Sequence, residues 1–133
     1  MWITMKVLYD LYLKKALDAA RTQPKSKQPE YTVDAEGFTQ INGDDAGQKF
    51  PWSDVRHVGI ITTSDGPFFD DVFFIIQFAN KNICLTSFQA EDMKLMSYFN
   101  ILPGFRYESA IEAMGSVDDA SFHCWDVSWA QPI

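Results

Sequence analysis

The stretch Val72-Phe-Phe-Ile-Ile-Gln-Phe-Ala79 is the most apolar run of the chain, and it decides the fold. Its β-branched and aromatic residues favour a β-strand, and apolar side chains fill both of its alternating faces. A strand that is apolar on both faces is typical of the centre of a sheet covered on both sides. The turn Asn80-Lys-Asn82 leads into a second apolar run over 83–86, so residues 71–87 are predicted to form a β-hairpin.

Upstream of this hairpin, short apolar runs alternate with turns, which is typical of further strands. The runs 31–33 and 38–41 flank the turn Asp34-Ala-Glu-Gly37 and predict another hairpin. A cluster of turn residues fills 42–47, and β-branched residues over 55–63 predict a long strand. The upstream half of the chain therefore predicts an antiparallel arrangement around the central strand.

Downstream of the hairpin, the pattern changes to helices. Thr86 and Gln89 have the spacing of a capping box, and apolar residues at helical spacing predict a helix over 88–101. A second short helix is predicted over 107–114, and 121–127 is predicted to form the last strand. We therefore expect a single α+β domain, a bent antiparallel sheet or partly open barrel capped by helices.

Residues 1–29 form a segment with a different pattern. Apolar residues at spacings of three and four over 3–21 predict an amphipathic helix, and the polar stretch 22–29 with its two prolines predicts a linker. The domain proper is then expected over 30–133. The helix either docks on that domain through its apolar stripe or acts separately, in dimerisation or on a membrane surface.

Length and composition are those of one globular domain. The chain has 133 residues, of which 47% are hydrophobic and 22% charged, which excludes disordered and disulfide-scaffold classes. Cys84 and Cys124 each lie in an apolar run, which favours buried thiols over a secreted disulfide framework. No run approaches the roughly 18 apolar residues of a membrane span. We expect a cytoplasmic protein.

The charge is acidic and unevenly spread. The formal net charge is −7; residues 1–30 hold six cations against three anions, and residues 31–133 hold five against fifteen. An acidic body repels phosphate backbones and anionic lipids, so we expect no nucleic-acid partner and no recruitment to a membrane surface. If charge steers a macromolecular partner, we expect a basic protein. The pattern indicates no oligomeric state.

No catalytic, metal or cofactor site is predicted. Ser53, Asp54 and His57 lack the nucleophile elbow of a hydrolase, because no Gly-x-Ser-x-Gly occurs. The loop 42–53 lacks the carboxylate that closes a calcium loop. The side chains with soft ligand atoms lack the paired spacing of zinc sites and are expected to pack in the core; they are His57, His123, Cys84 and Cys124. We therefore expect no enzyme activity, no metal and no cofactor.

The segment Asp65-Gly-Pro-Phe-Phe-Asp70-Asp71 carries the candidate partner-binding residues. Two adjacent phenylalanines in a loop are costly to leave in water, so they either fold back onto the core or meet a partner. The flanking aspartates would give an exposed patch an acidic rim. The predicted partner-binding residues are Asp65, Phe68, Phe69, Asp70 and Asp71.

A small-ligand-binding domain is the alternative function. Its pocket would be lined by aromatic side chains, because ligand pockets are mostly apolar with a few polar groups that fix orientation. The candidate pocket residues are Trp52, Phe74 and Trp125.

Three short motifs resemble those of small bacterial pleckstrin-homology-like domain proteins. They are Trp52-Ser-Asp-Val55 before a strand, Asp71-Val72-Phe73-Phe74 at the start of an apolar strand, and Leu102-Pro103-Gly104-Phe105 after a helix. The resemblance covers residues 31–127. The chain departs from the family pattern where a further helix and strand follow the helix that normally closes the fold. The basic phosphoinositide pocket of the eukaryotic relatives also has no counterpart in this acidic body.

The resemblance implies a pleckstrin-homology-like fold. Some proteins of this type resemble immunity proteins that are encoded beside toxins. Together with the acidic charge and the lack of a catalytic motif, this predicts a non-catalytic protein-binding module, an immunity-like partner of a basic toxin.

Overall fold

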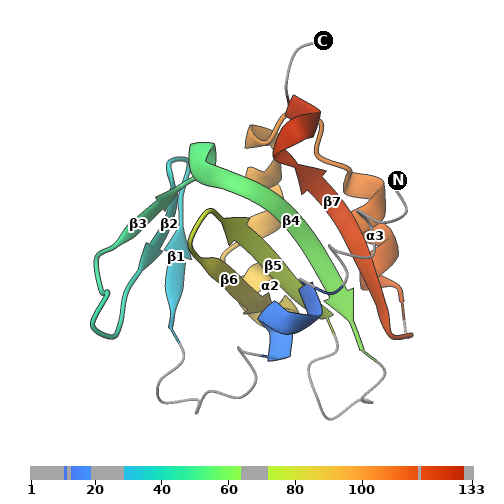
Figure 1. Ribbon diagram of the computed structural model, residues 1–133, viewed down its shortest axis with the longest axis horizontal. Helices are drawn as coiled ribbons and strands as arrows, with labels where there is room; N and C mark the ends of the chain where they lie inside the picture. Colours follow the sequence, from blue (N-terminus) through green and yellow to red (C-terminus); the bar gives the residue numbers. More distant parts are fainter. Residues whose placement is uncertain (1–10, 12, 19–28, 64–71, 117, 131–133) are drawn as a thin grey trace.

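The computed structural model describes residues 11, 13–18, 29–63, 72–116 and 118–130. Within them the chain forms two antiparallel β-sheets, of three and four strands, with several short helices (Figure 1). The α+β class expected from the sequence is confirmed. The strands form two separate sheets and are not closed into a barrel.

The three-stranded sheet is built from the predicted hairpin and one added strand. Its strands are β1 (Tyr31–Val33), β2 (Gly37–Gln40) and β3 (Lys49–Pro51), in the order β1-β2-β3. The turn cluster at 42–47 joins β2 to β3, as its glycines and aspartates predict. A short 3-10 helix, η2 (Trp52–Asp54), then leads directly into the second sheet.

The four-stranded sheet contains the apolar stretch that opened the sequence. Its strands are β4 (Val55–Thr62), β5 (Val72–Phe78), β6 (Asn82–Thr86) and β7 (Ala120–Asp126), in the order β6-β5-β4-β7. All seven residues of β5 are buried, and β5 lies between β4 and β6. The predicted central strand, the predicted hairpin and the predicted last strand are therefore confirmed.

The inner face of this sheet, the face that contacts the three-stranded sheet and the C-terminal helices, carries the main core. The covering helices are α2 (Ser87–Asp92), η3 (Leu95–Ile101) and α3 (Tyr107–Met114), and η4 (Val127–Ala130) follows β7. Phe99 is fully buried here and stacks on Phe105, with 4.3 Å between ring centroids. The same ring contacts Phe74 and Trp52 at centroid distances of 6.3 and 6.1 Å.

The continuous helix predicted over 88–101 does not form. The capping box is present, since Gln89 N donates to Thr86 Oγ1 and Thr86 N donates to Gln89 Oε1. The α-helix then ends at Asp92, and Lys94 adopts a left-handed conformation with φ 55°. The chain continues as the 3-10 helix η3, which places Leu95 and Phe99 in the core. Tertiary packing of these side chains prevails over helix propensity.

The outer face of the four-stranded sheet is covered in part by the N-terminal helix. Residues 13–18 are helical, and Leu13, Ala16 and Leu17 pack against Ile61, Phe73 and Ile75 of the sheet. Gly59 makes room for this contact, because a Cβ atom there would lie 2.7 Å from Leu13 Cδ1. The described part of the helix therefore docks on the domain. Among the described residues, no helix has the length and apolar composition needed to span a membrane.

Candidate functional site

A row of polar side chains crosses the outer face near one end of the four-stranded sheet. The register pairs Asp126 of β7 with His57 of β4, His57 with Gln77 of β5, and Gln77 with Asn82 of β6. Each of these residues lies next to core residues along its own strand, so the row faces away from the main core. The four strands thus place one polar side chain each on a single line, which we call the polar row.

Two β-bulges bring the row to the outer face. Between Val55 and His57 the pairing with β5 shifts register, so that Arg56 is the extra residue. Between Val58 and Gly59 the pairing with β7 also shifts, and Cys124 is the extra residue. In a regular strand, His123 and Asp126 would face opposite sides, because their offset is odd. A bulge re-aims the side chains that follow it, so both residues lie on the outer face here.

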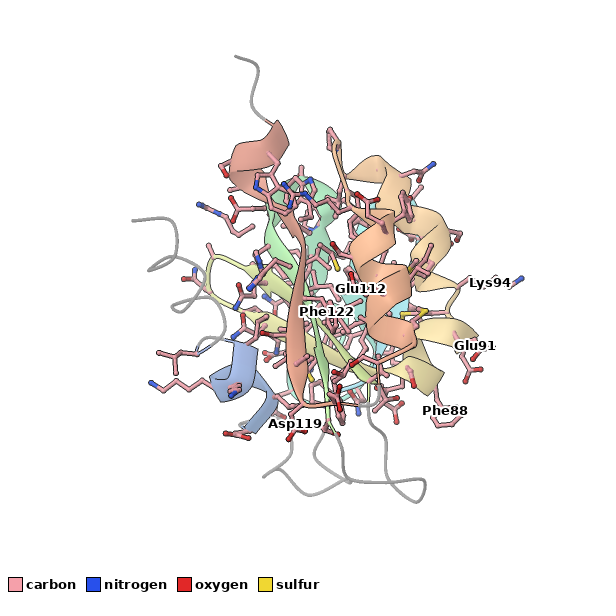
Figure 2. All side chains as sticks on the ribbon, turned by 90° about the vertical axis from the view of Figure 1, so that its right-hand side faces the viewer. Phe88, Glu91, Lys94, Glu112, Asp119 and Phe122 are labelled. Carbon is pink, nitrogen blue, oxygen red and sulfur yellow. The ribbon has the colours of Figure 1, made fainter. Side chains whose placement is uncertain are left out.

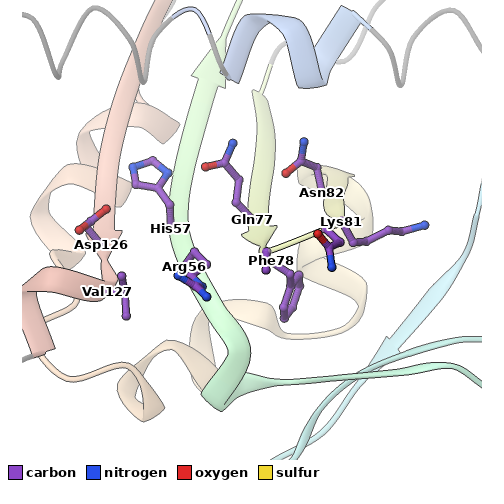
Figure 3. Close-up of a pocket in the computed structure, with 10 residues that line it drawn as sticks. Arg56, His57, Gln77, Phe78, Lys81, Asn82, Asp126 and Val127 are labelled. Carbon is purple, nitrogen blue, oxygen red and sulfur yellow. The ribbon is translucent and has the colours of Figure 1, made fainter.

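The polar row borders a cleft at the end of the sheet where the β5–β6 turn lies (Figure 3). The cleft has a volume of about 690 Å³, within the usual range for small-molecule sites. We call it the turn-end cleft. Its lining residues are Arg56, His57, Gln77, Phe78, Ala79, Asn80, Lys81, Asn82, Asp126 and Val127.

His57 is 2% exposed, and its Nε2 lies 3.2 Å from Nδ1 of His123. Burial lowers the pKa of His57 to about 4, and the neighbouring His123 lowers it further while Asp126 opposes the shift. His57 is therefore neutral at pH 7. One of the two facing nitrogen atoms donates a hydrogen bond to the other, so the pair holds its rings in a fixed relation.

Two other members of the row have contrasting hydrogen bonding. Asp126 is 9% exposed, and its Oδ2 accepts hydrogen bonds from the backbone N–H of Ser128, at 3.0 Å, and from the Ser128 hydroxyl. Gln77 is 7% exposed, and its Nε2 atom is buried with no hydrogen-bond partner among the described residues. The carboxylate is thus held in place, whereas the amide group of Gln77 has donor capacity to spare.

Two cationic residues belong to the lining of the cleft. Arg56 is exposed on its bulge, and Lys81 is half-buried in the β5–β6 turn. The Lys81 ammonium lies 6.0 Å from the ring centroid of Tyr31 and 5.9 Å from that of Phe50. These cation–π contacts direct the lysine toward the three-stranded sheet. The cleft lining therefore holds two cations and one carboxylate, in a protein whose net charge is −7.

The chemistry of the cleft is that of binding through hydrogen bonds. Its lining offers amide donors from Gln77, Asn80 and Asn82, the charges of Arg56 and Lys81, and one imidazole. None of the lining residues carries a hydroxyl or thiol. Within the part of the chain that the structure describes, no group of three or more His, Cys, Asp or Glu side chains could hold a metal ion.

The three aromatic residues predicted to line a pocket lie in the main core instead of the turn-end cleft. Trp52, Phe74 and Trp125 are 3%, 0% and 3% exposed. The indole N–H of Trp52 donates to the carbonyl of Asp34 at 2.9 Å, and that of Trp125 donates to the carbonyl of Pro103 at 2.8 Å. Their polar atoms are therefore used in joining segments of the fold.

The predicted partner-binding residues lie outside the described part of the chain; they are Asp65, Phe68, Phe69, Asp70 and Asp71. The strands that flank this segment are described, because Thr62 ends β4, Val72 begins β5, and the two pair with each other. The segment therefore joins the sheet at the end opposite the turn-end cleft, which we call the loop end.

The loop end also carries exposed acidic and apolar side chains. Asp118 and Asp119 are exposed beside Ala120, which pairs with Thr62. Phe88 is 69% exposed in the first turn of α2, which follows β6, and Met114 is 48% exposed at the last turn of α3. Figure 2 places Phe88 and Asp119 at the same end of the molecule. The hydroxyl of Thr62 donates to the carbonyl of Asp118 at 2.6 Å and anchors this end.

Comparisons of the chain with models of protein families, with curated proteins and with solved structures found no match. The site is therefore interpreted from its own geometry. Gln77 and Asp126 are not among the residues predicted from the sequence, although Gln77 carries a signal, since it is the one polar residue in the apolar run 72–79. A polar residue inside a buried strand marks a position where something other than packing is required.

Proposed function

We propose that this protein is a non-catalytic protein-binding module, and that its loop end contacts a basic protein. The observation that carries the proposal is that the exposed ring of Phe88 and the exposed carboxylate of Asp119, next to exposed Asp118 in the chain, lie at the same end of the molecule (Figure 2). Apolar side chains rimmed by charge are typical of protein interaction surfaces. Thr62 and Val72, the paired strand residues on either side of the segment with Phe68 and Phe69, lie at the same end.

The charge of the body supports a basic partner. Residues 31–133 hold fifteen anions against five cations. A field of one sign raises the rate of encounter with a partner of the opposite sign and disfavours partners of the same sign. This charge, together with the resemblance to immunity-like proteins, supports the specific proposal that the partner is a basic toxin.

The pleckstrin-homology-like identity belongs to this proposal. All three motifs that carry the resemblance hold buried anchors: Trp52 at the entry to β4, Phe74 in β5, and Leu102 and Phe105 between η3 and α3. The departure from the family pattern is also present, since α3 and β7 follow η3, and β7 pairs with β4. The closing strand would then be an addition at the edge of the family's sheet.

The experiment uses the full chain as bait in a lysate of its own organism, at low and at high salt. We expect one basic protein in stoichiometric amount at low salt, which is lost at high salt because screening weakens the attraction between charges. The variant Asp118→Lys/Asp119→Lys is expected to lose that protein. Reversing Asp70 and Asp71 in the neighbouring segment is expected to weaken binding in the same way.

The matched control is Asp44→Lys/Asp45→Lys, which makes the same charge change in an exposed turn of the three-stranded sheet. We expect this control to retain the partner, because the turn joins β2 to β3 in the three-stranded sheet, whose strands do not pair with the strands of the loop end. A bait that captures nothing at either salt concentration, or equal loss in both variants, would contradict the assignment of the loop end.

A further inference from the structure

The side-chain amide of Gln77 is a buried polar group with an unused hydrogen-bond donor. Its Nε2 is buried without a hydrogen-bond partner, whereas the other six residues of β5 are apolar and equally buried. A buried donor that lacks an acceptor destabilises a fold, and an apolar side chain of the same size would avoid this cost. Such a group in a folded protein calls for an explanation, and a ligand that accepts its hydrogen bond provides one.

The position of Gln77 fits that explanation. It stands between His57 and Asn82 in the polar row, and Figure 3 shows the three side chains on the same side of β4, β5 and β6. All three line the turn-end cleft, whose volume of about 690 Å³ has room for a small organic molecule. The residue with the spare donor thus lines a described cleft in which an acceptor could be placed.

The charges around the cleft indicate the class of acceptor. Arg56 and Lys81 line it and attract an anion, and the guanidinium group can pair with both oxygens of a carboxylate. Asp126 adds one negative charge to the same lining, which opposes a doubly charged phosphate more strongly than a singly charged carboxylate. The balance of two cations and one anion therefore favours a monoanion.

We infer that the turn-end cleft binds a small organic carboxylate, with Gln77 Nε2 donating a hydrogen bond to it and Arg56 and Lys81 providing the opposite charge. This site is separate from the loop end, which lies at the other end of the same strands. The protein would then carry two binding surfaces of different chemistry, one for a basic protein and one for a small acid.

The test is a titration of the full chain with sodium acetate and with sodium propionate, both monoanions, at constant ionic strength set by chloride, followed by the side-chain and backbone amide NMR signals. We expect saturable shifts at Gln77 and in the turn 79–82. Inorganic phosphate serves as the competing anion. Equal or larger shifts with phosphate, or shifts that never saturate, would overturn the inference.

Two variants separate ligand binding from a structural role. Gln77→Met keeps the length of the side chain and removes the donor, so we expect carboxylate affinity to fall by about tenfold or more. In the absence of acid, the same variant is expected to raise the thermal midpoint by about 3 °C, because the unpartnered donor is gone. A lower midpoint, or unchanged affinity, would show that the amide serves the fold.

Arg56→Gln provides a second variant that does not depend on the core, because Arg56 is exposed. We expect it to weaken acetate binding, whereas Lys49→Gln, which removes an exposed cation outside the cleft, is expected to have no effect. The loop-end variant Asp118→Lys/Asp119→Lys should bind acetate normally. Failure of the carboxylate site is therefore distinguishable from failure of the proposed partner surface.

Discussion

The two ends of the four-stranded sheet are built from the same strands and differ in how they treat polar groups. At the loop end, Asp118 and Asp119 are exposed. At the turn end, His57, Gln77 and Asp126 are each less than a tenth exposed. Solvated charges act at long range and cost the fold little, whereas buried polar groups act at short range and must each find a partner. The loop end is therefore suited to attracting a charged partner from a distance, and the turn end to selective recognition of a bound molecule.

The difference arises from what covers the outer face. The N-terminal helix places Leu13 and Leu17 over the apolar part of that face, next to Ile61 and Ile75. The polar row lies further along the strands, toward the β5–β6 turn, and lines the cleft. The outer face is therefore apolar where the helix covers it and polar toward the turn end.

The largest expected effect comes from removing the main contact of that helix. Leu13 is fully buried and fits against Gly59, so Leu13→Ala should lower the free energy of unfolding by about 3 kcal/mol through lost burial and a cavity. Chemical denaturation measures this change in the free energy of unfolding. The control is Leu11→Ala on the same helix, where the side chain is 58% exposed and the expected change is below about 0.5 kcal/mol. Equal effects of the two substitutions would mean that the helix does not cover the sheet in solution.

The second expected effect is a pH dependence of the free energy of unfolding, which arises from His57 at the turn end. The pKa of His57 is lowered from 6.5 to about 4, so between these pH values the unfolded chain binds more protons than the folded protein. Stability is therefore complete above pH 6.5 and falls as the pH drops toward 4, by about 3 kcal/mol in total at most.

The measurement is the free energy of unfolding at several pH values for the wild type and for His57→Gln. The many exposed carboxylates titrate in both proteins, so the difference between the two curves isolates the histidine. His123 and Asp126, which face His57, are unchanged in the variant. Parallel curves for the two proteins between pH 4 and 6.5 would contradict the burial of a neutral His57.

The smallest expected effect lies at the loop end. Asp118→Asn/Asp119→Asn removes two exposed charges from a protein of net charge −7, and the free energy of unfolding should change by less than about 0.5 kcal/mol. The same variant should bind a basic partner more weakly. A large loss of stability would show that these carboxylates serve the fold, and it would remove the contrast between the two ends.

Most of the elements could be predicted because their signals are local. The hairpin around Asn80-Lys-Asn82, the capping box at Thr86, and the turn at 42–47 depend on residues only a few positions apart. The prediction of a helix over 88–101 was wrong beyond Asp92. The left-handed conformation of Lys94 and the burial of Phe99 depend on packing against the sheets, which no local pattern shows.

The candidate site could not be predicted in the same way. Gln77 shows in the sequence as a polar interruption, but nothing local indicates that Asp126, 49 positions away, lies in the same row. The row also requires the bulges at Arg56 and Cys124. In a regular strand, side chains alternate between the two faces of the sheet, so His123 and Asp126 would lie on opposite faces without the bulge at Cys124. The aromatic residues chosen for a pocket, Trp52 among them, are instead buried in the main core.

The sequence by itself determined the class of fold, the strands and the acidic charge of the body, because alternation, turn chemistry and charge are properties of short stretches or of simple counts. Only the tertiary structure decided which polar side chains meet, because strand register and bulges follow from packing among segments far apart in the chain. The polar row across β7, β4, β5 and β6 belongs to this second kind of information.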